Sequence, residues 1–217
     1  MAAVPRRDGE ARAWLESIGR QAQPVTLARD RSISLPGDLG AVVPGAALQR
    51  GATLTVAGPV GAGATSLALE LAAAATAAGE WAAAVDLHGT LGGEAACAAG
   101  GALERFAVVR QVSPDRWATV VAALLEGVTL VLAEVPRGVK IGDARRLVAR
   151  ARERGSVLVA LETGARWTGD AQLRLHAAGG SWHGLASGAG LLTGRARSVR
   201  VDGQGEAARS RVVALVG

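Results

Sequence analysis

The sequence predicts an α/β fold, with a mostly parallel sheet flanked by helices and followed by antiparallel strands. Short apolar runs alternate with helical segments between residues 53 and 161. Such alternation is typical of βαβ units, whose strands are parallel. After residue 170 the strand-like runs are separated by glycine turns with no helical segment between them. This change of pattern indicates antiparallel strands at the C-terminal end of the sheet.

A short amphipathic helix is expected near the N-terminus. Ala11, Trp14, Leu15 and Ile18 fall at helical spacing within residues 9–22. Residues 28–50 contain Pro-Gly pairs and leave little room for regular structure. We therefore expect two parts, an N-terminal arm over residues 1–30 and a core domain over residues 31–217.

The core domain should contain five buried strands and four helices. The apolar runs that predict the strands are 53–57, 81–86, 106–109, 128–133 and 157–161. The segments that predict the helices are 65–78, 94–104, 114–126 and 141–154. Ser113 and Pro114 begin the third helix with an N-cap residue and a proline at the first helical position. The later strand-like runs are 172–176, 190–193, 198–201 and 211–216.

Composition indicates a globular intracellular protein. Of the 217 residues, 49% are hydrophobic, which is too many for a disordered chain. The single cysteine, Cys97, fits a reducing cytoplasm. The charged residues near the start lack an apolar stretch, and no apolar run reaches the roughly 18–20 residues of a membrane span, so we expect a cytoplasmic protein without a signal peptide. A net charge of +5 is only a weak indication of nucleic-acid binding.

The clearest motif is the glycine-rich segment from Gly58 to Ser66, between a predicted strand and a predicted helix. Its spacing follows the phosphate-binding pattern G-x-x-x-x-G-K-[ST], with Gly58, Gly63 and Thr65 in register. In this pattern backbone N–H groups and the helix N-terminus surround a phosphate. The candidate phosphate-loop residues are Gly58, Gly61, Gly63, Thr65 and Ser66. Ala64, however, occupies the lysine position, which removes the charge that stabilises the transferred phosphate.

Three interpretations of this segment remain open. It is most simply a strand-to-helix turn kept for structure. It is otherwise a dinucleotide site, in which Asp86 would bind a ribose hydroxyl, although the G-x-G-x-x-G spacing is incomplete. The third interpretation is an NTPase that receives its lysine from elsewhere in the fold.

Residues 35–86 carry a family resemblance. Leu35-Pro36-Gly37, Val43-Pro44-Gly45, Leu48 to Gly51, the glycine-rich segment and the run 81–86 resemble the RecA core and, more narrowly, the ImuA′ family. ImuA′ proteins are the RecA-like accessory subunits of the actinobacterial mutasome. The resemblance covers about residues 30–217. It implies a RecA-like fold and a role in DNA-damage-induced mutagenic translesion synthesis, beside the inactive polymerase homologue ImuB and an error-prone replicative-type polymerase.

Several positions depart from the RecA pattern. His88 stands where RecA has its water-activating glutamate, and Ala133 or Glu134 falls at the Walker B aspartate. Glu162 and Thr163 replace an Asn-Gln sensor pair. The resemblance with these departures implies a non-catalytic adaptor without a bound cofactor. The alternative is a nucleotide-binding regulatory ATPase that modulates RecA filaments.

The same resemblance implies weak or no direct DNA binding. The counterparts of the two DNA-binding loops, residues 136–142 and 164–170, are short. Trp167 would either stack on a base or pack inside the protein. His88, His176, His183 and Cys97 lack metal-ligand spacing, so no metal site is expected.

Two groups of residues are candidates for binding ImuB, and possible contact with RecA itself stays open. One group is the apolar stripe Trp14, Leu15 and Ile18, which suits helix-in-groove recognition. The other is the arginine cluster Arg195, Arg197 and Arg200. The arginines of residues 145–154 are interpreted as a solvated helix face.

Overall fold

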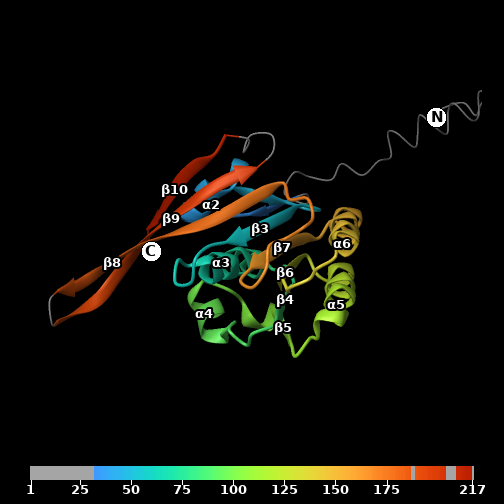
Figure 1. Cartoon of the computed structure of the whole chain (residues 1–217). Coiled ribbons are helices and arrows are strands. Elements are labelled where there is room, and N and C mark those ends of the chain that lie inside the picture. Colours follow the sequence, from blue (N-terminus) through green and yellow to red (C-terminus); the bar gives the residue numbers. More distant parts are fainter. Residues whose placement is uncertain (1–31, 187–188, 204–208, 217) are drawn as a thin grey trace, which may run out of the picture. The chain divides into compact units, whose positions relative to one another are not determined.

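The computed structural model describes residues 32–186, 189–203 and 209–216. The helix predicted over residues 9–22, with Trp14, Leu15 and Ile18, lies outside these residues. The described part contains an eight-stranded sheet in the order β10-β9-β8-β3-β7-β6-β4-β5 (Figure 1). Its strands are β3 Thr53–Ala57, β4 Ala82–Asp86, β5 Phe106–Arg110, β6 Leu130–Glu134, β7 Val157–Glu162, β8 Leu173–Ala186, β9 Ala189–Gly203 and β10 Arg211–Val216.

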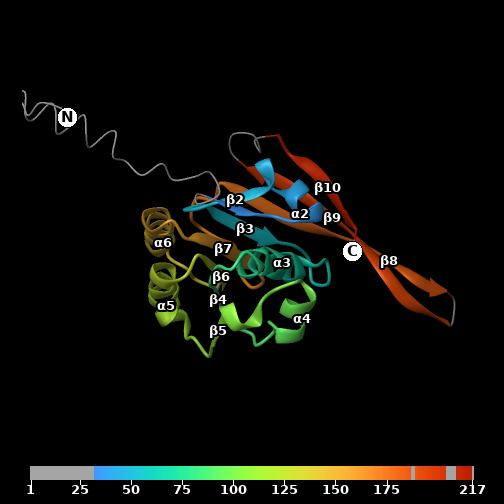
Figure 2. The same cartoon turned by 180° about the vertical axis from the view of Figure 1, so that it is seen from behind.

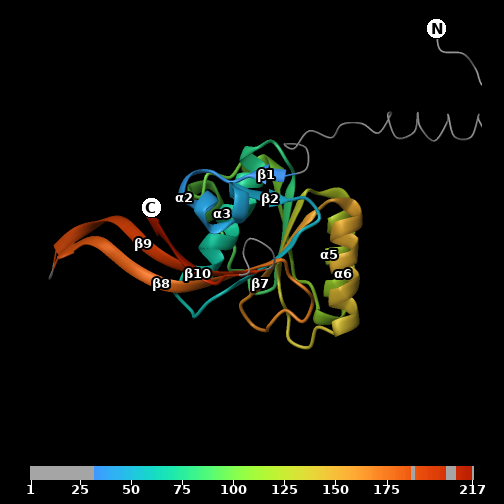
Figure 3. The same ribbon diagram turned by 90° about the horizontal axis from the view of Figure 1, so that it is seen from above.

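The sheet is parallel from β8 to β5 and antiparallel from β8 to β10. Helices cover both faces of the parallel part (Figure 3). The helices α3 (Ala64–Ala77) and α4 (Gly93–Ala98) cover one face, and α5 (Pro114–Gly127) and α6 (Ile141–Arg154) cover the other. The predicted fold class is therefore confirmed, and it is consistent with a RecA-like α/β fold. No helix among the described residues is long and apolar enough to cross a membrane.

Two hydrophobic cores lie on the two faces of the sheet, and alternate residues of each strand contribute to them. In β6, Leu130 and Leu132 pack in the core beside α3, whereas Val131 and Ala133 pack in the core beside α5 and α6. This alternation follows from the two-residue period of a strand. The five strands β3 to β7 lie close to their predicted ranges because each is a short apolar run, and helices cover β3, β4, β6 and β7 on both faces.

Two predictions for the parallel region need correction. The helix predicted over 94–104 ends at Ala98, because Gly100 adopts the left-handed φ of +85° and a short 3-10 turn, Leu103–Arg105, follows. The strand β5 was expected to be buried, but most of its side chains are at least partly exposed. It lies at the edge of the sheet and has β4 as its single neighbour.

The prediction that residues 28–50 leave little room for regular structure is wrong for the described residues. They form β1 (Ser32–Ser34), α2 (Gly37–Val42), a 3-10 turn (Pro44–Ala46) and β2 (Ala47–Gln49), and β1 pairs antiparallel with β2. The prolines delimit these elements: Pro36 precedes α2 and Pro44 begins the 3-10 turn. Ile33 of β1, Val42 of α2 and Leu48 of β2 are buried in the core.

The antiparallel strands are longer than predicted. The runs 190–193 and 198–201 belong to the single strand β9, and β8 continues to Ala186 instead of ending near residue 176. The paired outer segments, residues 180–186 of β8 and 189–196 of β9, project beyond the rest of the sheet (Figures 1 and 2). We call these two segments the arm. Gly180 and Gly184 lie so close to the backbone of β9 that a side chain at either position would overlap it.

Candidate functional site

The glycine loop (residues 58–63) lies at the carboxyl ends of the parallel strands, where ligands bind in open α/β sheets. A pocket of about 510 Å³ opens beside this loop. Its walls come from the loop, the start of α3 and the residues that follow β4, β6 and β7, together with one side chain from β9. The lining residues include Gly58, Gly61, Gly63, Ala64, Thr65, Ser66, His88, Thr90, Glu134, Glu162, Thr163 and Arg195. All five predicted phosphate-loop residues therefore lie at this pocket.

The backbone of the loop needs glycine at two positions. Gly61 and Gly63 have φ values of +79° and +98°, in the left-handed region that side chains disfavour. The N–H of Ala62 donates to the carbonyl oxygen of Pro59 at 3.0 Å, which closes a turn. Ala64 is the first residue of α3 and is buried, so the methyl group stands where the phosphate-binding pattern has its lysine.

Glu134 is the carboxylate that β6 brings to the pocket. Its side chain is fully buried and accepts hydrogen bonds from the backbone N–H groups of Leu87 at 2.6 Å and His88 at 3.1 Å. The adjacent Ala133 packs in the core beside α5 and α6. Of the two residues considered at this position, Glu134 reaches the pocket and Ala133 does not.

His88 lies beside this carboxylate, with Nδ1 at 3.1 Å from the same Glu134 oxygen. Its side chain is 52% exposed and lines the pocket. Glu162 enters the pocket from the end of β7, and one of its oxygens accepts the N–H of Trp167 at 3.2 Å. The predicted positions after β4, β6 and β7 thus meet in space, although the carboxylates of Glu134 and Glu162 are already held by protein donors.

Asp86 does not serve the dinucleotide interpretation. Its buried carboxylate accepts hydrogen bonds from Arg110 Nε at 3.0 Å and from the N–H groups of Thr90 at 3.0 Å and Leu91 at 3.2 Å. Burial alone would raise the pKa of Asp86, but the hydrogen bonds from Arg110, Thr90 and Leu91 outweigh burial and hold the pKa below its ordinary value. The side chain is committed to the fold and is absent from the lining of the pocket.

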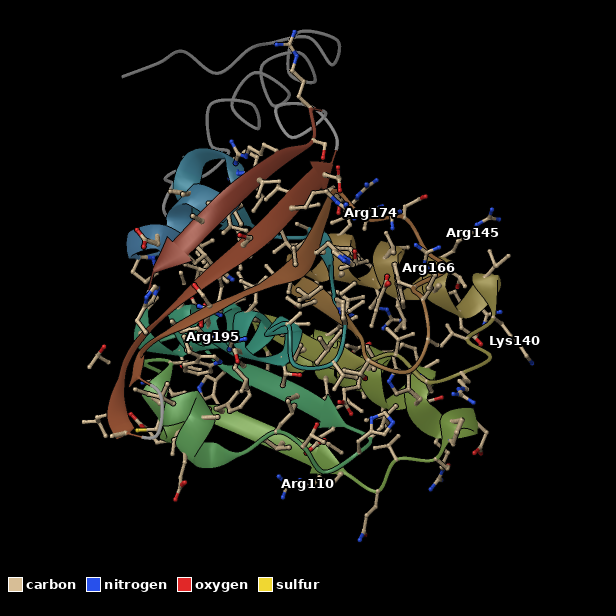
Figure 4. All side chains as sticks on the ribbon, turned by 60° about the vertical axis from the view of Figure 1, so that its left-hand side comes forward. Arg110, Lys140, Arg145, Arg166, Arg174 and Arg195 are labelled. Atoms are coloured by element: carbon tan, nitrogen blue, oxygen red, sulfur yellow. The ribbon has the colours of Figure 1, made fainter. Side chains whose placement is uncertain are left out.

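The arginine cluster predicted on the C-terminal strands is not one surface. Arg195 lies against the glycine loop, where its Nη2 donates to the carbonyl oxygen of Gly61 at 3.0 Å. Arg197 pairs with Glu70 of α3 at 2.7 Å, and Arg200 lies 3.5 Å from Asp202 on β9 itself. Because side chains alternate along a strand, Arg200 points to the opposite face from Arg195 and Arg197. Figure 4 also shows Arg195 well apart from Arg145, Arg166, Arg174 and Lys140.

Trp167 packs inside the protein. It is 6% exposed and contacts Trp117 of α5 in an edge-to-face arrangement with ring centroids 6.3 Å apart. Its Nε1 donates to the carbonyl oxygen of Asp170 at 3.3 Å. Of the two roles considered for Trp167, packing is therefore the one observed, and the ring is not available for base stacking.

Three of the five arginines of α6 pair with acidic side chains, as on a solvated helix face. Arg150 and Arg154 both contact Glu126 of α5, and Arg146 lies 3.6 Å from Asp143. Within the described ranges, no group of His, Cys, Asp and Glu side chains is arranged to hold a metal ion.

No pattern in the sequence indicated that Arg195 would reach the glycine loop. The two partners of this hydrogen bond lie 134 residues apart, and only the pairing of β9 with β8 beside β3 brings them together. The polar lining residue Thr90, whose hydroxyl lies 3.4 Å from Glu134 Oε1, was also missed because it follows β4 in a loop without a recognised motif.

Comparisons with known proteins place the chain in a family. The model of the family described as the MT3502 N-terminal domain matches residues 41–169. The matched region begins within α2, contains the glycine loop and the strands β3 to β7, and stops before β8. A comparison with curated proteins found no match. Because the matched region spans more than half of the sequence, this chain belongs to the MT3502 N-terminal domain family.

Proposed function

We propose that this protein is a non-catalytic, RecA-like adaptor that acts in DNA-damage-induced mutagenic translesion synthesis. The single observation that carries the proposal is the state of the glycine loop, which keeps its turn but has a buried alanine at position 64. Phosphoryl transfer depends on positioned positive charge around the phosphates, and the lysine is a central part of it. An α/β core that keeps its shape without this lysine, and in which the Arg195 guanidinium at the pocket is held by the Gly61 carbonyl oxygen and the Trp182 ring, is better suited to binding proteins than to hydrolysing ATP.

The groups that would activate water also favour a role without catalysis. Glu134 is fully buried and accepts two backbone N–H groups, and His88 stands at the position of the catalytic carboxylate. A fully buried carboxylate that already accepts protein donors is poorly placed to receive a proton from an attacking water. The second candidate, a nucleotide-binding regulatory ATPase that modulates RecA filaments, is favoured by one observation, the pocket of about 510 Å³ beside the loop.

The ImuA′ resemblance supplies the partners of the proposal. They are ImuB, through it an error-prone replicative-type polymerase, and possible contact with RecA. The two surfaces named for ImuB were the N-terminal stripe with Trp14, outside the described residues, and the arginine cluster. Since Arg197 and Arg200 are paired within the protein, the proposal for the second surface moves to the arm, where Trp182 and Leu191 are 57% and 79% exposed.

Catalysis is tested by measuring ATP hydrolysis with magnesium. We expect no turnover above background in the natural sequence, and none in Ala64→Lys, because a lysine alone does not supply a water-activating carboxylate. Turnover in the natural sequence that disappears in Thr65→Ala would contradict the adaptor proposal and favour the regulatory ATPase.

Partner binding is tested by capture of purified ImuB with the full chain. We expect a Trp182→Ala, Leu191→Ser variant to lose most of the captured ImuB, because exposed aromatic and apolar side chains supply most of the binding energy at interfaces. Trp81→Ala is the matched control, since Trp81 is exposed to a similar extent, 50%, but lies just before β4, far from the arm. Undiminished capture by the arm variant, with loss in a Trp14→Ala, Leu15→Ser variant, would move the interface to the N-terminal stripe.

A further inference from the structure

Strand β8 contacts the glycine loop at its first glycine, Gly58, just before the arm begins. A Cβ atom added to Gly58 would lie 2.6 Å from the carbonyl oxygen of Ala177 in β8 and 3.0 Å from its Cβ. No side chain fits in this space without moving the backbone of β8. Gly58 is therefore required by the close approach of β8, a requirement independent of any phosphate.

Arg195 makes the second contact. Besides donating to Gly61, its Nη2 lies 3.1 Å from the position that a Cβ of Gly63 would occupy. On its other side the guanidinium stands over the ring of Trp182, 4.8 Å from the centroid. Trp182 and Arg195 are paired directly across the two strands of the arm, so they share one face. The guanidinium is thus held between the loop and an aromatic ring of the arm.

Arg197 makes the third contact, two residues further along the same face of β9. Its pair with Glu70 fixes β9 to α3, the helix that begins at the end of the glycine loop. The two side chains are only 12% and 23% exposed. Ion pairs with limited exposure are screened less by solvent than surface pairs. Together the three contacts hold β8 and β9, where the arm begins, to the glycine loop and to α3.

The arm needs such support because a two-stranded ribbon has little stability of its own in water. Both strands of the arm leave their side chains largely exposed, and the register shifts between Ala177 and Gly180. Trp182 and Leu191 are 57% and 79% exposed, so their own packing contributes little to holding the arm. The contacts at the loop therefore add to the pairing of β8 with β3 in holding the arm relative to the core.

We propose that the glycine loop is an internal binding site for the arm, in which the Gly61 carbonyl oxygen holds the Arg195 guanidinium. The loop holds the arm in the orientation that presents Trp182 and Leu191, and this consequence for partner binding rests on the proposed adaptor function. The glycines kept at 58, 61 and 63 serve the backbone turn and the approach of β8 and Arg195. If the loop is a structural turn, its specific role is to hold the arm.

The test is amide hydrogen exchange of the full chain without any partner. In Arg195→Ala we expect exchange in the arm to become about threefold to tenfold faster, the effect of losing one partly exposed charged hydrogen bond and one cation–π contact. Exchange in β6 and β7 should stay unchanged. Arg200→Ala is the matched control, because Arg200 lies on the same strand but on the opposite face, beside Asp202. Unchanged exchange of the arm in Arg195→Ala would overturn the proposal.

A second variant and a ligand test approach the same question from the loop. Gly58→Ala should also speed exchange in the arm, since the added methyl group pushes β8 away from the loop. Millimolar inorganic pyrophosphate or ATP should leave the exchange of the loop and the arm unchanged. Slower exchange in the loop with either ligand, whether or not the arm is released, would show that the loop and Arg195 bind anions and would overturn the role of the loop as a purely internal site. All of these measurements are made without ImuB, so failure of the arm proposal and failure of the adaptor proposal are separate results.

Discussion

Buried carboxylates at the ends of β4 and β6 are satisfied by the protein itself. Asp86 accepts a hydrogen bond from Arg110 and two from backbone N–H groups, and Glu134 accepts two backbone N–H groups. A buried charge is stable only when donors of this kind replace water. At the residue scale, the edge of the sheet where a ligand would bind is therefore organised to stabilise loops.

The first prediction at this scale concerns Arg110. Because the pKa of Asp86 is held below its ordinary value of 3.8, its charge stabilises the fold above that pH, and the stabilisation is lost as pH falls through the folded-state pKa. Arg110→Ala removes the main cause of the lowering, so the pKa should rise and the loss should begin at higher pH. We expect a decrease of about 1.5–3 kcal/mol in the free energy of unfolding at pH 7.

Urea unfolding at pH 7 and pH 3 measures this effect. The difference between the natural protein and Arg110→Ala should shrink at pH 3, because this pH lies below the ordinary pKa of 3.8 and the stabilisation that comes from the lowered pKa of Asp86 has begun to be lost. Arg137→Ala is the control, because Arg137 is exposed and makes no ion pair among the described residues. A difference that does not depend on pH would show that Arg110 acts through packing and not through the charge of Asp86.

At the element scale, the segment between β7 and β8 is held by one large side chain. Trp167 closes the core beside α5 by packing against Trp117, and its backbone N–H is bound by Glu162. This segment corresponds to the second DNA-binding loop of RecA in the resemblance, and here its tryptophan is used for packing. The hydrophobic pattern of the sequence indicated a strand end at this place, but the partner of Trp167 lies on a helix 50 residues earlier.

The prediction at this scale is that Trp167→Ala destabilises the protein by about 3–5 kcal/mol, the usual cost of truncating a buried aromatic side chain. Thermal and urea unfolding measure the change. Trp81→Ala should cost much less, because half of that side chain is already exposed and it makes one cation–π contact, with Arg105. Equal losses in the two variants would contradict the assignment of Trp167 to the core.

At the scale of the whole molecule, β3 and the glycine loop that follows it lie between two regions of one continuous sheet. On one side of β3 lie β7, β6, β4 and β5 with their helices, and on the other β8 pairs with β3 and leads to β9, β10 and the projecting arm (Figure 1). The family match covers most of the first region and ends before the second. The contacts of Arg195 and Arg197 join the two regions through the loop and α3.

The prediction at this scale is that the protein does not form ATP-dependent filaments on DNA. RecA-type filaments, to which the resemblance points, hold ATP between neighbouring subunits, and this loop has an alanine in place of the lysine that binds the phosphates. Electron micrographs of the protein with single-stranded DNA, ATP and magnesium should show no filaments, with RecA as the positive control. Filaments that require ATP would contradict the prediction.

The sequence by itself determined the parallel α/β core, because its strands are short apolar runs that alternate with segments of helical period. It also identified the glycine loop, and the resemblance to RecA indicated the residues at the ends of β4, β6 and β7 that meet there. Only the tertiary structure showed that Glu134 enters the pocket whereas Ala133 does not, that Asp86 is bound by Arg110, and that Arg195 reaches the loop. These contacts join residues far apart in the chain, and their geometry depends on strand order and register, which local pattern and propensity do not encode.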